Sequence, residues 1–225
     1  MIIQKYIVCI IIAVLQVIPG MVRAQDLAKL NALRAETDIQ KQINILFSIT
    51  DDKESLKTID QAIKQDPSNP SFYYLRGILN NGREKYSKAL NDFSNAIDMG
   101  AGSLLLYRCY LGRGVSYMKL MEFENAMADL NSSIEKNDTL AVAYYSRAMI
   151  HYELKDYEAS VQDFQKILRF TEGNGEFYFN LGMAYYRLED KEQACRNLNK
   201  ACTLGNTNAC RMSLMECAKA IPTLP

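Results

Sequence analysis

The sequence predicts an all-α fold, an α-solenoid built from antiparallel helix pairs, on three observations. A pattern of small and aromatic residues returns about every 34 residues along the chain. Within each copy, apolar residues follow one another at three- and four-residue steps, as they do on one face of a helix. The 5 prolines and 11 glycines are few, and they stand between the apolar runs. Such helix pairs expose apolar surface singly, so neighbouring pairs must stack to form a core.

A small residue marks the middle of the first helix in each clear copy. These residues are Gly77, Gly114, Ala148 and Gly182, at spacings of 37, 34 and 34 residues. We expect the second helix of each pair to approach closely there, where a large side chain would hold it off. The second helices carry small and bulky residues at helical spacing, namely Ala89/Phe93/Ala96, Ala126/Leu130/Ser133, Ser160/Phe164/Ile167 and Ala194/Leu198/Ala201. A degenerate copy, with no glycine at its crossing point, precedes them and ends at Asp66-Pro67.

This pattern resembles the tetratricopeptide repeat (TPR) family over about residues 36 to 208. The resemblance is carried by Tyr73, Gly77, Ala89, Phe93 and Ala96, by Tyr110, Gly114, Tyr117, Ala126 and Leu130, by Tyr144, Ala148, Tyr157 and Phe164, and by Tyr178, Gly182, Tyr185, Ala194, Leu198 and Ala201. It implies a right-handed superhelix. The expected organisation is a signal peptide (1–24), an extension of the first helix (25–35), a degenerate repeat (36–69), four repeats (70–106, 107–140, 141–174, 175–208) and a C-terminal capping helix with a tail (209–225).

Charged residues also recur in step with the repeat. Arg76, Arg113 and Arg147 each precede the small crossing residue, and Asp92, Asp129 and Asp163 each lie 16 residues later. In the last copy both charges are absent, since Leu181 and Asn197 take these positions. The joint presence and loss predicts an ion pair between the two helices of each pair. Alternatively, both groups are solvated surface charges.

The first 24 residues read as an export signal. Lys5 precedes an apolar run from Ile7 to Ile18, and small residues end the segment at Ala24. The run is short for a transmembrane helix, although a retained anchor is the alternative. We expect cleavage after Ala24, no direct membrane insertion of the mature chain, and an exported, periplasmic or secreted location in a bacterial envelope.

Four cysteines crowd near the C-terminus at spacings of seven, eight and seven residues. Suppose that the helix with Cys195 and Cys202 turns back near Gly205 into an antiparallel helix. Residues whose numbers add up to the same total then face each other, which pairs Cys202 with Cys210 and Cys195 with Cys217. Two disulfides are one interpretation, and small buried side chains are another. A four-thiolate zinc site is disfavoured because two helical turns separate the pairs by about 10 Å. The last repeat also resembles the cysteine-bridged, Sel-like relatives of TPRs, which favours the disulfides.

The composition argues against several functional classes. The 26 basic and 26 acidic residues balance, and no basic stripe suited to nucleic acid is present. His151 is the only histidine and occupies the packing position of Tyr117 and Tyr185, so no histidine-based triad or metal site is expected. We therefore expect no enzyme activity, no cofactor, no metal and no nucleic-acid partner.

The TPR resemblance implies a concave face formed by the first helices. Its expected lining is apolar, aromatic and rich in methionine: Tyr74, Ile78, Leu111, Val115, Met118, Tyr145, Met149, Tyr152, Phe179, Met183, Tyr186 and Arg187. Among the positions of a carboxylate clamp only Asn81 matches, so chaperone-tail binding is not supported. We expect a non-enzymatic adaptor that binds another protein or peptide in this groove. Alternatively, the stripe is internal core, covered by the helix from about Asp26 to Ile49 or by a second copy of the chain. The protein would then be a structural subunit that self-associates or braces a larger membrane-associated assembly.

Overall fold

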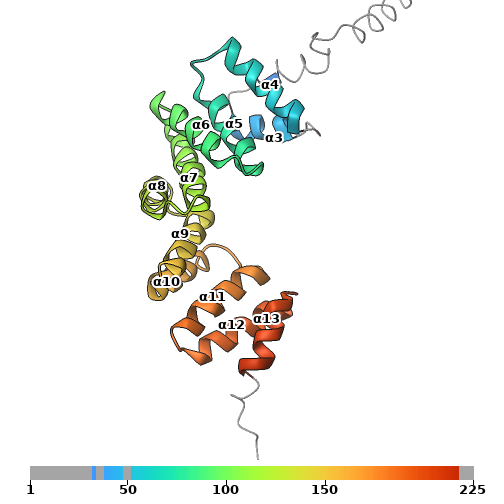
Figure 1. Cartoon of the computed structure of the whole chain (residues 1–225), viewed down its shortest axis with the longest axis vertical. Coiled ribbons are helices and arrows are strands. Elements are labelled where there is room, and N and C mark those ends of the chain that lie inside the picture. The colour runs from blue at the N-terminus through green and yellow to red at the C-terminus, as the bar shows by residue number, and fades with distance from the viewer. Residues whose placement is uncertain (1–31, 34–37, 48–51, 218–225) are drawn as a thin grey trace, which may run out of the picture. The chain divides into compact units, whose positions relative to one another are not determined.

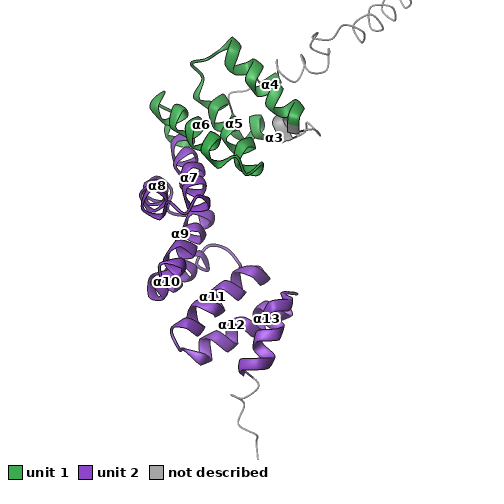
Figure 2. Ribbon diagram, viewed as in Figure 1, with its two compact units in different colours: residues 1–105 green, residues 106–225 purple. Residues whose placement is uncertain are grey.

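The computed structural model describes residues 32–33, 38–47 and 52–217, and every regular element in these ranges is helical (Figure 1). The predicted signal segment, the 25–31 part of the predicted extension and residues 218–225 lie outside the described residues. The chain divides into two compact units, residues 1–105 and 106–225 (Figure 2). Each unit is described by itself.

The described part of unit 1 begins with α3 (Ile39–Phe47) and α4 (Asp52–Gln65). The pair α5 (Pro70–Gly82) and α6 (Tyr86–Asp98) follows, and then the start of α7 (Ser103–Lys119). Helix α5 packs against both α4 and α6. Phe93 is fully buried opposite Gly77, where a Cβ atom would lie 2.7 Å from the Phe93 ring. The small residue is therefore required by close approach, as predicted.

Unit 2 continues from α7 with helices that pack in chain order. They are α8 (Phe123–Lys136), α9 (Ala141–Glu153), α10 (Tyr157–Ile167), α11 (Gly175–Arg187), α12 (Lys191–Thr203) and α13 (Thr207–Met212), with a π-helical turn η1 (Ser213–Cys217). Each helix from α8 to α12 packs against the next one. Helix α7 is joined to α8 through side chains that are described below. Helix α13 and η1 both pack back against α12, which closes the C-terminal end.

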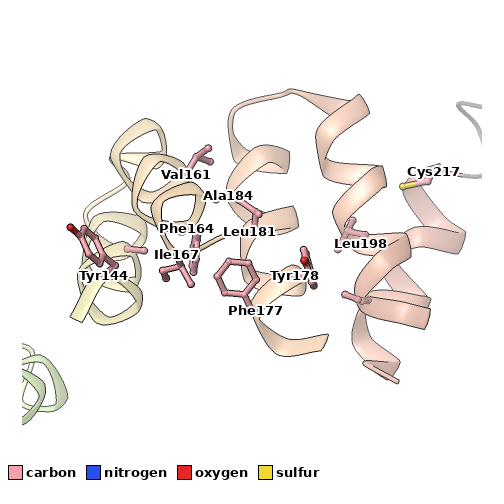
Figure 3. Packing of buried hydrophobic residues seen from close by; sticks show 13 residues of the cluster. Tyr144, Val161, Phe164, Ile167, Phe177, Tyr178, Leu181, Ala184, Leu198 and Cys217 are labelled. Carbon is pink, nitrogen blue, oxygen red and sulfur yellow. The ribbon is translucent and has the colours of Figure 1, made fainter. Parts of the chain in front are cut away.

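Aromatic rings form the centre of the unit 2 core (Figure 3). Phe164 of α10 meets Phe177 of α11 edge to face at 5.3 Å between ring centroids. Leu198 of α12 packs on the other side of α11, where a Cβ atom on Gly182 would lie 3.0 Å from its Cγ. The core thus runs through α11, and α11 and α12 approach so closely at residue 182 that a Cβ atom there would require Leu198 to shift.

Local sequence defines the ends of these helices. Asn174, Asp190 and Asn206 each accept a hydrogen bond from the backbone N–H three residues later, at 2.8, 3.1 and 2.9 Å, and so start α11, α12 and α13. The turns inside the four clear pairs each contain one non-glycine residue in the left-handed region, with φ between 58° and 65°: Glu84, Met121, Lys155 and Glu189. These turns follow the same period as the small residues.

The predicted arginine–aspartate ion pairs are confirmed in all three copies. The shortest distances are 2.6 Å for Arg76–Asp92, and 2.7 Å for both Arg113–Asp129 and Arg147–Asp163. The aspartate side chains are only 5 to 8% exposed. The hydrogen bond to Asp129 raises the pKa of Arg113, although burial opposes it. These pairs are buried ties between helices, which excludes solvated surface charges.

Two of the arginines also reach the preceding helix pair. Arg76 donates to Asp60 of α4 at 2.8 Å, and Arg147 donates to Asn131 of α8 at 2.6 Å. Residues 60 and 131 lie 16 positions before their arginine, just as the main aspartates lie 16 positions after it. Each of these guanidinium groups therefore links three helices. The sequence pattern predicted only the tie within a pair.

Tyrosines lie beneath these arginines. The guanidinium carbons of Arg76, Arg113 and Arg147 stand 5.4 to 5.7 Å from the ring of the tyrosine three residues earlier, in each case the aromatic residue of the repeat pattern. In the last copy, where Leu181 replaces the arginine, Lys200 Nζ lies 4.1 Å from the Tyr178 ring. The last copy thus has a cation over its tyrosine ring, although it lacks the arginine–aspartate ion pair.

Ser160, where the repeat usually has alanine, is a polar residue in the core. It is fully buried, and its hydroxyl group has no hydrogen-bond partner in the part of the chain that the structure describes. Ser133, at the end of α8, is equally buried, but its Oγ donates to the Tyr107 carbonyl at 2.9 Å. An unpaired buried hydroxyl group costs about 1–3 kcal/mol of stability. Replacing the two serines with alanine should therefore change stability in opposite directions.

The ion pairs predict a large loss of stability when one partner is removed. Asp163→Ala leaves Arg147 without its main partner and should lower the free energy of unfolding by about 3–5 kcal/mol. Asp138→Ala, at an exposed position, should change it by no more than about 0.5 kcal/mol. Urea unfolding followed by circular dichroism measures both; equal midpoints for the two variants would contradict a structural role for the pair.

Ser160→Ala is expected to stabilise the protein by about 1 kcal/mol, because it removes the unpaired hydroxyl group from the core. Ser133→Ala is the matched control and should destabilise by about 1 kcal/mol, because its deletion leaves the Tyr107 carbonyl without that donor. Thermal unfolding of both variants is the measurement. A loss of stability in Ser160→Ala would mean that the hydroxyl group has a partner after all.

Candidate functional site

The predicted binding stripe falls on the first helices of the pairs. In unit 2, its members lie on α7, α9 and α11 and keep part of their surface exposed: Leu111, Val115, Met118, Tyr145, Met149, Tyr152, Phe179, Met183, Tyr186 and Arg187. In unit 1, Ile78 of α5 is likewise partly exposed. The stripe of unit 2 is therefore the candidate site.

Tyr74 differs from the prediction. Its side chain is only 6% exposed, and its ring lies 6.0 Å from that of Phe93. It belongs to the core between α5 and α6, so it offers little surface to a partner. Spacing alone placed it with Leu111, Tyr145 and Phe179, and spacing does not show how deeply a helix sits against its partner.

A cavity of about 180 Å³ opens between α9, α10 and α11. Four predicted groove residues line it, two from α9 and two from α11: Met149, Tyr152, Phe179 and Met183. The remaining lining is Glu153, Phe164 and Asn180. On each helix these residues lie within four positions of one another, at three- and four-residue steps, which places them on one face. The structure thus gathers the centre of the predicted stripe around one small opening.

The floor of this cavity is rigid and its walls are adaptable. Phe164 is fully buried and is held edge-on between Tyr145, at 5.7 Å, and Phe177, at 5.3 Å. Met149 and Met183 supply unbranched side chains that can adjust to different shapes. A cavity with this construction suits an apolar side chain whose exact form varies.

Hydrogen bonds between α9 and α11 hold the polar groups around the cavity. Asn180 Nδ2 donates to the Tyr145 hydroxyl at 2.7 Å, and Arg187 Nε donates to the Tyr152 hydroxyl at 3.3 Å. Burial raises the pKa of Tyr145, and the nearby Glu176 carboxylate raises it further. The phenol therefore stays neutral at physiological pH and remains a hydrogen-bonding group.

Sequence reasoning missed three lining residues for two different reasons. Glu153 and Asn180 directly follow the predicted residues Tyr152 and Phe179, so a rule that chose one residue per turn passed over them. Phe164 belongs to a second helix and was assigned to the core, where most of it lies. It is fully buried and still forms part of the cavity lining.

The sole histidine of the sequence lies on α9. His151 is partly buried, with Nδ1 3.6 Å from Asp156 Oδ2. Within residues 32–33, 38–47 and 52–217, no group of three or more histidine, cysteine or acidic side chains is arranged to hold a metal ion. Over the same residues, no helix is both long and apolar enough to cross a bilayer.

The four C-terminal cysteines come together in the predicted pairs. The Cα atoms are 5.6 Å apart for Cys195–Cys217 and 4.6 Å apart for Cys202–Cys210, within the range that a disulfide spans. The pairs tie α12 to η1 and to α13. Oxidation of these pairs in the cell stays a prediction. Cys109 is unpaired and buried on α7, and burial raises its pKa to about 12.

Comparison with known families identifies the repeats. One family model for the tetratricopeptide repeat matches residues 141–174, and another matches residues 175–208. Residues 141–208 therefore carry two tetratricopeptide repeats. Such repeats are typically modules for protein–protein interaction and not catalytic folds, so the chain is an interaction scaffold in this general sense.

Among curated proteins, serine/threonine-protein phosphatase 5 is similar to part of the chain. The human protein is 29% identical over 104 residues, which is 46% of this chain and 20% of the phosphatase. The protein of Rattus norvegicus is 29% identical over 115 residues, 50% of this chain and 22% of the phosphatase. The chain therefore matches only about a fifth of the length of these relatives.

Solved TPR structures share the fold at low sequence identity. YrrB, described as a TPR protein with an unusual peptide-binding site, has a TM-score of 0.63 at 21% identity and covers 88% of this chain and 99% of its own. MamA of Desulfovibrio magneticus has a TM-score of 0.65 at 16% identity, over 78% and 94% of the two chains. The Cut9–Hcn1 structure of the APC/C has a TM-score of 0.66 at 17% identity and covers 89% of this chain and 40% of its own. With the helix pairs above, these confirm the predicted all-α solenoid class.

Thiol mapping tests the cysteine pairs. Alkylation in denaturant without reductant should modify Cys109 and leave Cys195, Cys202, Cys210 and Cys217 unmodified, as read from peptide masses. In the folded protein at pH 8, Cys109 should also resist alkylation, because its raised pKa keeps it a thiol. The stability from this raised pKa is present below pH about 9 and is lost as the pH rises towards about 12.

A matched reduction experiment supplies the control. Reductant should expose all four C-terminal thiols and lower the free energy of unfolding by about 2–4 kcal/mol. Alkylation of the four cysteines without reductant would show that they are simply small buried side chains.

Proposed function

We propose that this chain is an exported, non-enzymatic adaptor of a bacterial cell envelope that binds a polypeptide on the exposed stripe of unit 2. The observation that carries the proposal is the cavity between α9, α10 and α11, where Met149, Tyr152, Phe179 and Met183 converge. A small apolar opening with a few polar groups around it is the usual form of a recognition site.

Peptide binding is supported by the accessibility of the stripe. Tyr145, Met149, Phe179 and Met183 all pack against the core of unit 2, yet each keeps part of its surface exposed. Contiguous exposed apolar surface is costly in water and commonly marks an interface. The likeness to YrrB, whose description names a peptide-binding site, agrees with this use of the fold.

Export is supported by two features of the sequence. The first 24 residues have the charge, apolar run and small end residues of a signal peptide. Four cysteines in two matched pairs suit a compartment in which disulfides persist. Together they favour the periplasm or the cell exterior as the place where the partner is met.

Capture from native envelope extracts tests the proposal. Met149→Gln combined with Met183→Gln should reduce recovery of the wild-type partners by about tenfold or more, because central apolar contacts carry most of an interface's binding energy. Quantitative mass spectrometry of the captured proteins is the measurement. The methionine-to-glutamine change keeps the length of the side chain and mainly removes its apolar character.

Met121→Gln is the matched control for this experiment. Met121 is 71% exposed in the turn between α7 and α8, and it does not line the cavity. This variant should retain every partner. Unchanged recovery with the double variant would remove the groove from consideration. If wild type is a dimer by light scattering and only the double variant is a monomer, the occupant is a second copy of the chain.

A further inference from the structure

The cavity of unit 2 also carries information on which polypeptide segment it selects, an inference that rests on the proposed function. Its volume of about 180 Å³ slightly exceeds an engineered apolar cavity of about 150 Å³ that accepts benzene. One large apolar side chain, such as phenylalanine or leucine, therefore fills it. The fully buried floor at Phe164 leaves no room for a second anchor beneath the first.

The one charged residue in the lining of this opening is a glutamate. Glu153 lines the cavity from the last turn of α9, its side chain is exposed, and it forms no ion pair within the described residues. Glu176, in the first turn of α11, acts electrostatically on Tyr145, whose ring packs on the cavity floor. It is likewise exposed and outside any ion pair of the described chain.

No ion pair joins a cation to Glu153 within the described residues. Arg187 keeps its positive charge, because its hydrogen-bond partner is the Tyr152 hydroxyl group, but it lies outside the cavity lining. Arg147 is held by Asp163 and Asn131, and Lys166 lies near the Tyr144 ring, 6.0 Å from its centroid. The cavity lining therefore presents one negative charge, that of Glu153, to an incoming segment.

We propose that the cavity receives one large apolar side chain of a partner segment and that Glu153 selects segments with lysine or arginine beside this anchor. In an extended segment, side chains alternate, so the residues that share the anchor's face lie two positions away, about 7 Å along the chain. A basic residue at either position can reach a carboxylate next to the cavity. An acidic residue there meets like charge.

Peptide titrations observed by NMR test this selection. Full-length protein with ¹³C-labelled methionine methyl groups is titrated with acetyl-Gly-Lys-Ser-Phe-Ser-Lys-Gly-amide and with the matched peptide in which both lysines are glutamate. The basic peptide should shift the Met149 and Met183 methyl signals, assigned from Met149→Leu and Met183→Leu. Its Kd should be about fivefold lower than that of the acidic peptide, as expected for an exposed ion pair.

Variants separate charge selection from general stickiness. Glu153→Lys should reverse the preference, and Glu153→Gln should abolish most of it. Glu135→Lys, an equal charge change at an exposed position of α8 outside the cavity lining, should leave it unchanged. Replacing the peptide's phenylalanine with alanine should remove the methionine shifts, and the difference between the two peptides should shrink in 0.5 M NaCl.

The outcomes distinguish this inference from the function on which it rests. Equal affinities for basic and acidic peptides, with shifts at Met149 and Met183, overturn charge selection and leave peptide binding intact. Shifts confined to other methionines, or no shifts with any peptide, overturn the cavity as the anchor site. Failure of the adaptor proposal itself is read separately, from unchanged partner capture by the methionine double variant.

Discussion

The close crossing of two helices at a residue without a bulky side chain is the constraint on which the rest of the structure depends. At Gly77 and Gly182 there is no room for even a methyl group without displacing Phe93 or Leu198. This contact brings the helices near enough for Arg76 to reach Asp92 across the pair. Replacing the crossing residue with a larger one would therefore disturb both the packing of the two helices and the ion pair between them. The same contact decides which faces of α9 and α11 stay partly exposed, because the second helix of each pair fixes the position of the first.

Much of this arrangement could be predicted from sequence because it is periodic. The small residues, the arginine–aspartate pairs and the cysteine pairing all follow from positions that repeat or mirror one another, and such relations survive without knowledge of the fold. The additional bonds from Arg76 to Asp60 and from Arg147 to Asn131 were not predicted. They depend on how successive pairs stack, and stacking leaves a weaker mark on sequence than pairing does.

The cavity shows the same limit from the functional side. Four of its seven lining residues were predicted from their helical position. Tyr74 was wrongly included as a surface residue, and Glu153 and Asn180 were missed. Exposure depends on the depth and rotation of each helix, which small differences in neighbouring side chains decide. A repeat pattern indicates the face, but only the packed structure shows which part of that face is open and what charge it has.

The last helix pair differs from the others in what joins its parts. It lacks the arginine–aspartate tie, since Leu181 and Asn197 occupy those positions, and it has instead the two cysteine pairs between α12 and the elements that return onto it. With these cysteines oxidised, the two ends of unit 2 respond to different variables of the surroundings. The α7–α10 part is held by arginine–aspartate ion pairs, which thiol chemistry does not affect, whereas the α12–η1 part depends on the thiol–disulfide balance. Transfer to a reducing compartment would therefore loosen the C-terminal end of unit 2 first.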